Sequence, residues 1–474
     1  MWNEIWNGAE SNMSLESPDF VHSVCFRDFF WLDVLQPSRS GGHAARLLAA
    51  KRTAAGQGTA IARQRRKAPR NAGDRMQRRQ VMMAFAGIAL GAAAAREAIG
   101  QEATEAREDI AGTLRPYLAS HNLPALAAAV VRGGVTVATG AVGTRRVATD
   151  APVAINDRFH IGSDTKAMTA LAAAILVEAG KLRWEATLGE TFPDLAARLH
   201  PTLGGVTLEQ LLSHTSGIPT DDEAIAKLLE QSYAQQDLNL DELRLWLLAQ
   251  WAGQEPQTKP GTQFAYSNLG YTFAGAMIER AGRATWEEIV AASVFGPLGL
   301  RSAGFGPQAS LGRIDAPLGH LPRDDGTLKA MLAGPDGDVP PIYGPAGTVH
   351  LSVLDFAAWA SWNAGEGKRG PALVRPETLR RLHTPVISMD RPHAPPGTPP
   401  SGSYGLGWGT TSLPFSSEDF IFHGGSNGMN LAYIMMQPER DFAMVLMTNV
   451  GGTKADEALK ALAGELYGRF KPAR

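Results

Sequence analysis

The chain reads His160-Ile-Gly-Ser163-Asp-Thr-Lys166-Ala-Met-Thr-Ala-Leu-Ala-Ala-Ala-Ile-Leu-Val-Glu-Ala-Gly180 at its most informative point. This pattern predicts a turn that leads into an apolar helix ending at Gly180. Ser163 and Lys166 are three residues apart, so they lie on one face of the first helical turn. A serine at a helix N-terminus with an amine within reach is the arrangement of an activated nucleophile, provided that burial or a second cation lowers the pKa of the amine. The alternative is a serine cap followed by a solvated lysine, which is the commoner fate of such a tetrapeptide.

Two further motifs follow downstream. Tyr266-Ser267-Asn268 precedes an apolar helix predicted over 271–281, and it also fits an ordinary helix start with a packed tyrosine. His423-Gly424-Gly425-Ser426 is predicted on a strand, where paired glycines let another group approach the backbone closely. The alternative for this third motif is a simple strand end and turn. Each motif alone is weak evidence for a function, and the order of the three motifs along the chain is more specific.

Strand-like segments lie near both ends of the chain, and helical periodicity dominates between them. Apolar runs at 127–131 and 135–141 flank Arg132-Gly133-Gly134, which predicts a hairpin. Further strands are predicted at 404–411, 419–423, 430–437 and 442–449, and helices at 105–121, 353–363 and 454–470. We therefore predict an α/β protein of the α+β type, in which an antiparallel sheet is flanked by N- and C-terminal helices and a mainly helical domain is inserted. The sheet-containing domain would comprise 102–157 and 336–474, and the helical domain 158–335 would carry Ser163, Lys166 and Tyr266.

The N-terminal segment differs from the rest in charge. The 474 residues include 45 Lys and Arg against 47 Asp and Glu, yet residues 1–79 carry 13 basic residues against 7 acidic ones, so the remainder is acidic. From Met76 the chain has the layout of a secretory signal peptide, and the paired Arg78 and Arg79 resemble a twin-arginine export signal. We expect residues 1–75 to be a disordered or non-native extension, and 76–101 to export the protein to the periplasm or the medium. The alternative is a basic arm that binds nucleic acid or a surface.

Several other classes of protein are disfavoured by composition. The single cysteine, Cys25, excludes an intramolecular disulfide framework and a Cys-rich zinc module. No apolar run approaches the ~20 residues of a membrane-spanning helix. The 11 His include no His-x-His or His-Glu-x-x-His pattern. We therefore expect no metal, no cofactor and no stable membrane span, and the acidic body argues against nucleic acid as a partner.

The order Ser-x-x-Lys, Tyr-x-Asn and His-x-Gly resembles that of the serine β-lactamase and penicillin-recognising superfamily. The match is closest to its class C-like branch, which includes D-alanyl-D-alanine peptidases, D-aminopeptidases and β-lactamase-like esterases. Supporting stretches are 207–219, 344–348 and 404–409, and the first opens with a capping box of Thr207 and Gln210. The resemblance covers residues 105–470 and implies a β-lactamase/transpeptidase-like fold.

The resemblance also implies an acyl-enzyme mechanism. Ser163 would be acylated, Lys166 would be its base or the partner of the base, and Tyr266 would carry a proton to the leaving group. Which of the latter two takes the first proton stays open. The implied substrate-binding and oxyanion-hole groups are Asn268, His423, Gly424, Gly425 and the backbone N–H groups of Ser163 and Ser426.

The third motif departs from the Lys-Thr-Gly of class C β-lactamases because it begins with His423. A histidine is charged only part of the time near pH 7. We therefore expect weak β-lactamase activity, and an affinity for anionic substrates that falls as the pH rises past ~6.5. Residues 424–428 also match the Gly-x-Ser-x-Gly of α/β-hydrolases, but no His follows Ser426 and a strand is predicted at 429–437.

The predicted function is a serine hydrolase that acts on ester or small D-amino-acid-type amide substrates. The alternatives are a class C-like β-lactamase or D-alanyl-D-alanine carboxypeptidase, and a non-catalytic scaffold or binding protein that keeps the fold. A small-molecule ester, amide or β-lactam is the expected partner.

Overall fold

The computed structural model describes residues 107–334, 337–391 and 394–473. The extension predicted at 1–75 and the signal-like segment at 76–101 lie outside the described residues, as does Cys25. Both therefore remain predictions.

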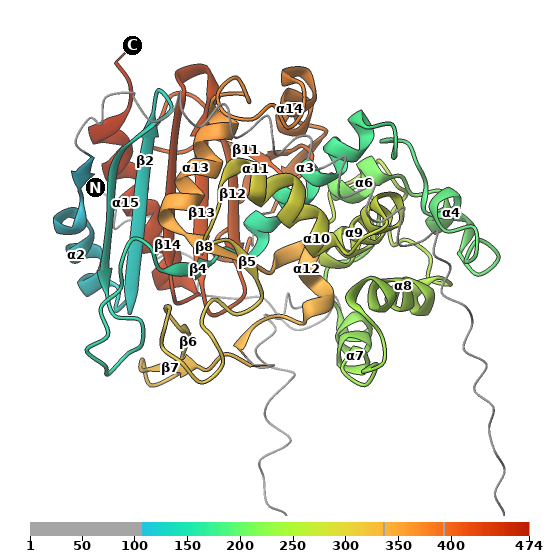
Figure 1. Ribbon diagram of the computed structural model, residues 1–474, viewed down its shortest axis with the longest axis horizontal. Coiled ribbons are helices and arrows are strands. Elements are labelled where there is room, and N and C mark those ends of the chain that lie inside the picture. The colour runs from blue at the N-terminus through green and yellow to red at the C-terminus, as the bar shows by residue number, and fades with distance from the viewer. Residues whose placement is uncertain (1–106, 335–336, 392–393, 474) are drawn as a thin grey trace, which may run out of the picture. The chain divides into compact units, whose positions relative to one another are not determined.

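A nine-stranded sheet forms the centre of the described part of the chain (Figure 1). Its strands, in spatial order, are β1 (Glu108–Asp109), β3 (Val135–Gly143), β2 (Ala125–Arg132), β14 (Phe442–Thr448), β13 (Leu431–Gln437), β12 (Phe420–Ser426), β11 (Gly409–Thr411), β10 (Ser401–Tyr404) and β9 (Ile387–Asp390). Neighbouring strands are antiparallel except for the parallel pair β1–β3. The two ends of the described chain thus build one sheet, which confirms the predicted fold class. The predicted domain boundaries stay a prediction.

Both faces of the central strands are buried, which explains their nearly continuous apolar sequence. Alternate side chains of β14 enter different cores because strand side chains alternate in direction. Met444 packs in one core with α2 (Ala111–Ser120) and α15 (Thr453–Phe470), and Val445 packs in the other with α13 (Val353–Ala364). Figure 1 shows α13 on the face of the sheet opposite α15.

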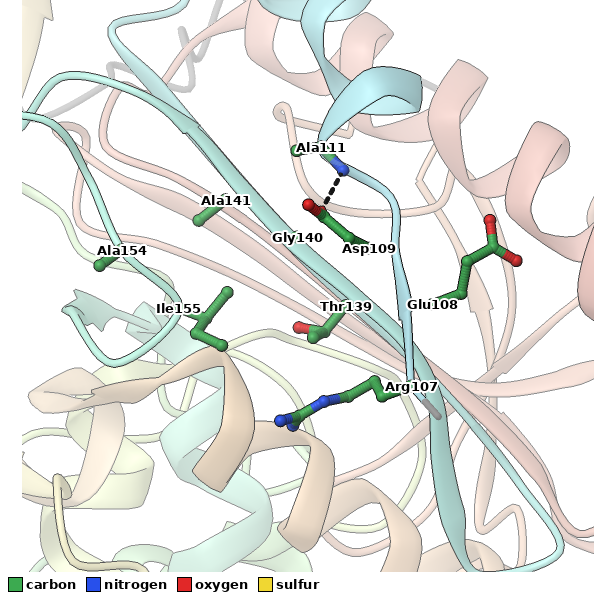
Figure 2. Close-up of a pocket in the computed structure, with 9 residues that line it drawn as sticks. All are labelled: Arg107, Glu108, Asp109, Ala111, Thr139, Gly140, Ala141, Ala154 and Ile155. Carbon is green, nitrogen blue, oxygen red and sulfur yellow. Dashed lines mark hydrogen bonds between the residues drawn. The ribbon is translucent and has the colours of Figure 1, made fainter. Parts of the chain in front are cut away.

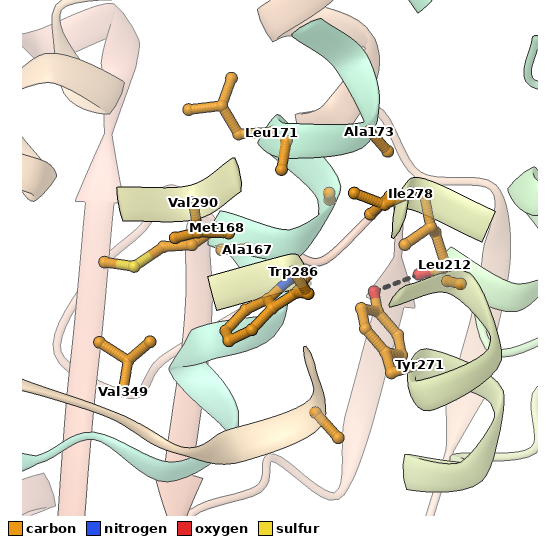
Figure 3. Packing of buried hydrophobic residues seen from close by; sticks show 14 of the residues in the cluster. Ala167, Met168, Leu171, Ala173, Leu212, Tyr271, Ile278, Trp286, Val290 and Val349 are labelled. Atoms are coloured by element: carbon orange, nitrogen blue, oxygen red, sulfur yellow. Dashed lines mark hydrogen bonds between the residues drawn. The ribbon is translucent and has the colours of Figure 1, made fainter. Parts of the chain in front are cut away.

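A helical region extends from the α13 side of the sheet and shares its core. Its elements are η1 (Gly162–Asp164), α3 (Thr165–Glu178), α4 (Leu188–Thr191), α5 (Pro201–Gly204), α6 (Leu208–Leu212), α7 (Glu223–Ser232), α8 (Leu240–Trp251), α9 (Asn268–Gly282), α10 (Trp286–Val290), the π-helix η2 (Ala291–Phe295) and α11 (Gly296–Leu298). Trp286 of α10 is fully buried in the same cluster as Met168 of α3, and the Tyr271 hydroxyl of α9 donates to the Leu212 carbonyl (Figure 3).

Small elements complete the described part of the chain. They are the three-stranded sheet of β4 (Arg158–His160), β8 (Val349–Ser352) and β5 (Gly304–Phe305), the hairpin β6 (Gly319–Pro322) and β7 (Leu328–Met331), η4 (Pro341–Tyr343), α12 (Gly344–Gly347), α14 (Pro376–His383) and η5 (Pro438–Arg440). The predicted capping box is present, because Thr207 Oγ1 accepts from Gln210 N and Gln210 Oε1 accepts from Thr207 N at the start of α6.

Two predicted elements were wrong in extent. The helix predicted at 105–121 begins only at Ala111, because Glu108–Asp109 pairs with β3 and Asp109 Oδ1 accepts the N–H of Ala111 (2.9 Å). The strand predicted at 404–411 is interrupted between β10 and β11. There Gly405 N donates to Trp408 O (2.7 Å) and Gly407 has φ +80°, a turn geometry that glycine permits.

Candidate active site

Ser163 lies on η1, a short 3-10 turn that continues directly into α3. The turn begins with Gly162 at φ +51°. A Cβ on Gly162 would lie 2.4 Å from the backbone nitrogen of Ser426, so only glycine fits there. The half-buried Ser163 side chain is therefore placed at the N-terminus of a buried helix, facing the end of β12.

Lys166 is completely buried, and its Nζ lies 3.0 Å from Ser163 Oγ. The same nitrogen donates to Asn268 Oδ1 (2.8 Å), at the start of α9, and to the Ala346 carbonyl (2.7 Å) of α12. Burial lowers the pKa of Lys166 to about 7, against the opposing effect of nearby carboxylates. A large share of the amine is therefore uncharged near neutral pH.

Tyr266 supplies the second contact of the serine. Its hydroxyl donates to Ser163 Oγ at 2.8 Å, and its ring centroid is 4.7 Å from Lys166 Nζ. Burial raises the pKa of Tyr266, while its hydrogen bond to Ser163 and the charge of Arg391 oppose that rise. The phenol is therefore protonated at neutral pH and can donate.

His423 lies on β12 and is only 5% exposed. Its Nε2 is 3.0 Å from the Tyr404 hydroxyl and its Nδ1 is 2.9 Å from the Gly424 carbonyl, which assigns the proton to Nδ1. Burial, reinforced by Lys166, lowers the pKa of His423 to about 3. A neutral imidazole at pH 7 argues against the expectation that the charge of His423 controls the binding of anionic substrates, and that expectation stays a prediction.

Ser426 ends β12 beside the nucleophile turn, and its hydroxyl is already engaged. Its Oγ donates to Asn430 O (2.7 Å) and accepts from Gly428 N (3.0 Å). A Cβ on Gly425 would lie 1.8 Å from Ile161 O and 2.6 Å from Ser163 N, so the two backbones approach as closely as glycine allows. The segment after Ser426 leads into the strand β13 rather than a helix, in contrast to a nucleophile elbow.

Sequence motifs did not single out several groups that complete this cluster. Asp221 accepts from Asn268 Nδ2 (2.7 Å) and from the Tyr343 hydroxyl (2.8 Å). His214 packs its ring 4.2 Å from that of Tyr266, and its Nδ1 accepts from the backbone N–H of Ser267 (3.1 Å). The sequence offered one indication of two such groups: His214 and Ala346 lie within the stretches 207–219 and 344–348 that support the family resemblance.

A pocket opens beside Tyr266 and is lined by His423, Gly424 and residues 397–399. The guanidinium of Arg391 lies 5.3 Å from the Tyr266 ring centroid. Burial lowers the pKa of Arg391, and among the described residues no carboxylate acts on it, only the two tyrosines Tyr266 and Tyr404. Arg391 therefore places a cation beside Tyr266, with no ion-pair partner among the described residues.

A second hollow lies at the β1 edge of the sheet, separated from β12 by four strands (Figure 2). Its lining includes Arg107, Asp109 and Thr139 but no lysine, histidine or serine. It therefore offers no alternative nucleophile–base pair. Within the described ranges, no cluster of His, Cys, Asp and Glu could hold a metal ion, and no helix is long and apolar enough to cross a membrane.

Comparison with known proteins places this geometry in a family. The Beta-lactamase family model matches residues 110–468. Protein flp of Staphylococcus aureus (strain MRSA252) is 21% identical over 346 residues, which cover 73% of this chain and 63% of that protein, so the chain spans less than two thirds of that relative. Penicillin-binding protein 4 of Amycolatopsis lactamdurans is 26% identical over 372 residues, covering 74% of this chain and 88% of the relative.

The structure of the octameric penicillin-binding protein homologue from Pyrococcus abyssi superposes with a TM-score of 0.59 at 26% identity, covering 74% of this chain and 76% of that one. The predicted family is thereby confirmed: the chain belongs to the Beta-lactamase family, whose members are in general serine hydrolases.

Proposed function

We propose that this protein hydrolyses esters or small amides through an acyl-enzyme formed on Ser163. The observation that carries the proposal is the contact of a fully buried amine, Lys166 Nζ, with Ser163 Oγ at 3.0 Å. A neutral amine has two hydrogens and one lone pair. Because Asn268 Oδ1 and Ala346 O accept the two hydrogens, the lone pair faces the serine hydroxyl. This arrangement favours Lys166 over Tyr266 as the first base.

The reaction follows from these contacts. Lys166 takes the proton of Ser163 as Oγ attacks the substrate carbonyl carbon. The tetrahedral oxyanion is stabilised by the backbone N–H groups of Ser163 and Ser426. As the bond to the leaving group breaks, the Lys166 ammonium returns its proton through the Tyr266 hydroxyl to the leaving oxygen or nitrogen. A water molecule then attacks the acyl carbon and gives a proton to Lys166 through the Tyr266 hydroxyl. The proton passes to Ser163 Oγ as the acyl–oxygen bond breaks, which releases the acid and restores the free serine.

Arg391 bears on the choice of substrate. His423 is neutral, so within the described part of the pocket the permanent cation is Arg391. A guanidinium that lies beside Tyr266 and has no counter-ion among the described residues favours substrates that carry a carboxylate near the scissile bond. This observation keeps a class C-like β-lactamase or D-alanyl-D-alanine carboxypeptidase as the second candidate.

Export remains part of the proposal. It rests on the sequence from Met76 onward, with the paired Arg78 and Arg79. The complete cluster of Ser163, Lys166 and Tyr266 argues against the alternative that the protein is a non-catalytic scaffold.

Replacing Ser163 tests the nucleophile. We expect Ser163→Ala to lower kcat for p-nitrophenyl acetate by about 10⁴-fold or more. Ser426→Ala is the matched control, because it keeps the backbone N–H and should retain activity within about tenfold. The rate of nitrocefin hydrolysis, measured in the same experiment, shows whether the protein turns over esters or β-lactams faster. Loss of activity in Ser426→Ala alone would show that the nucleophile is misassigned, and a wild type inactive on ester, amide and β-lactam substrates would favour the scaffold.

The buried amine predicts the pH profile. Because the base must be unprotonated and burial lowers the pKa of Lys166 to about 7, kcat/KM should rise with pH, reach half its maximum near pH 7 and level off above that. The buried His423 cannot produce this limb, since its pKa is about 3. A limb centred above pH 9 in stopped-flow or spectrophotometric assays would mean that Lys166 behaves as an ordinary solvated amine.

Arg391 should discriminate between two substrates that differ by one charge, 3-acetoxybenzoate and 3-acetoxybenzamide. We expect Arg391→Gln to raise KM for the benzoate by about 10- to 100-fold, the loss of one charge-assisted contact, with little effect on the benzamide. Arg183→Gln, which removes an exposed guanidinium, serves as the control. Equal losses on both substrates would contradict a role in recognising the carboxylate.

A further inference from the structure

Asp221 lies just before α7 and contacts two parts of the active site at once. One carboxylate oxygen accepts from Asn268 Nδ2 (2.7 Å), and the other accepts from the hydroxyl of Tyr343 (2.8 Å). With both oxygens used as acceptors, the contacts suit the ionised carboxylate, which has no hydrogen to donate. Asp221 thus links the start of α9 to the η4 turn by hydrogen bonds.

The first contact fixes the orientation of an amide. Asn268 presents Oδ1 to Lys166 Nζ and Nδ2 to Asp221. If the amide were rotated by half a turn, Nδ2 would point at the amine and one of its two acceptors would be lost. A carboxylate that accepts only from Nδ2 excludes this rotation, so Asp221 dictates which atom of Asn268 reaches Lys166.

The second contact fixes the other acceptor. Tyr343 is 3% exposed and ends η4, which leads directly into α12 and therefore to the Ala346 carbonyl. The buried Arg244 holds the same turn from the other side, by donating to the Ile342 carbonyl (3.0 Å). The carbonyl that accepts from Lys166 is therefore anchored on one side by Asp221 and on the other by Arg244.

We propose that Asp221 is a positioning residue, which holds Asn268 and the Tyr343–Ala346 segment so that the Lys166 lone pair meets Ser163, and whose negative charge stabilises the protonated amine between steps. The inference rests on the proposed function, because it assigns Lys166 the role of base. Among the described residues, the Asp221 carboxylate makes hydrogen bonds to Asn268 and Tyr343 and to neither Ser163 nor the residues that line the pocket.

Other charged and titratable groups face Lys166 from the surrounding elements. They are Asp164 on η1, His214 after α6, Tyr266 before α9, Tyr271 on α9, and His423 on β12. Asp164 also raises the pKa of Lys166, although less than Asp221 does. The carboxyl of Asp164 is fully buried with no hydrogen-bond partner among the described residues, and burial holds its pKa well above the usual range. Burial also raises the pKa of Asp221, but the hydrogen bonds from Asn268 and Tyr343 and the charge of Lys166 oppose that rise, so Asp221 is better able to supply the charge.

Three variants separate charge from position. Asp221→Asn removes the charge and can keep both contacts: its carbonyl accepts from Asn268 Nδ2, and its amide donates to the Tyr343 oxygen, which reverses the direction of that bond. Asp221→Ala removes both. Asp222→Asn is the matched control one residue away. Asp222 caps α7 through Ile225 N (2.9 Å), and asparagine caps as well as aspartate. The charge of Asp222 acts on Asp221 and Tyr343 but is not among those that shift the pKa of Lys166.

We expect the acidic limb of kcat/KM for p-nitrophenyl acetate to move to lower pH in Asp221→Asn, because the ammonium loses the negative charge that stabilises it most. In Asp221→Ala, kcat should also fall by about 100-fold with little change in KM, because the amine is no longer held in place. Asp222→Asn should leave both the limb and kcat unchanged. A limb that stays in place in Asp221→Asn, or one that moves equally in Asp222→Asn, would overturn the assignment.

A direct titration keeps this inference separate from the proposed function. The ¹³Cε signal of Lys166, assigned by its absence in Lys166→Met, can be followed against pH in wild type and Asp221→Asn without any substrate. A lower titration midpoint in Asp221→Asn supports the role of Asp221 even if no ester is turned over, and an unchanged midpoint contradicts it even if every ester is turned over. Thermal unfolding of each variant shows whether a loss of kcat reflects unfolding instead.

Discussion

The burial of the Lys166 amine is the constraint on which the rest of the site depends. A buried ammonium loses several kcal/mol of hydration free energy, so the amine must either be deprotonated or donate hydrogen bonds to protein acceptors. Here it does both: its pKa is about 7, and Asn268 Oδ1 and Ala346 O accept from it. Three helices, α3, α9 and α12, must therefore meet at one point.

Close packing between those helices makes the meeting possible. A Cβ on Gly275 of α9 would lie 2.2 Å from Pro345, so α12 approaches α9 as closely as glycine permits. Thr169 of α3 donates its hydroxyl to the Pro345 carbonyl (2.7 Å), which ties α12 to the helix that carries Lys166. On the other side, Gly162 and Gly425 let β12 approach Ser163. The sheet thus supplies the oxyanion-stabilising backbone, and the helical region supplies the base.

The sequence predicted what local spacing determines. The Ser163–Lys166 contact follows from a three-residue separation on one helical turn, and the strands of the C-terminal half follow from alternation and turn residues. Tyr266 and Asn268 are about a hundred residues away from Ser163 and Lys166 in the sequence. Their contacts with these two residues could be predicted only through the resemblance to a family. The burial of His423, which argues against a charged imidazole there, is a tertiary property that a motif does not encode. Asp221 and Arg391 lie in loops without periodicity, where no local rule indicates what a side chain will meet.

The central claim is that a neutral, buried Lys166 activates Ser163, and covalent labelling tests it most directly. The protein would be treated at pH 8 with an alkyl fluorophosphonate, which forms a stable adduct with an activated serine, and the labelled residue would be identified by peptide mass spectrometry. The account predicts one adduct on Ser163, formed rapidly in wild type and much more slowly in Lys166→Met. An adduct on Ser426, or labelling of Ser163 at the same rate in both proteins, would contradict it.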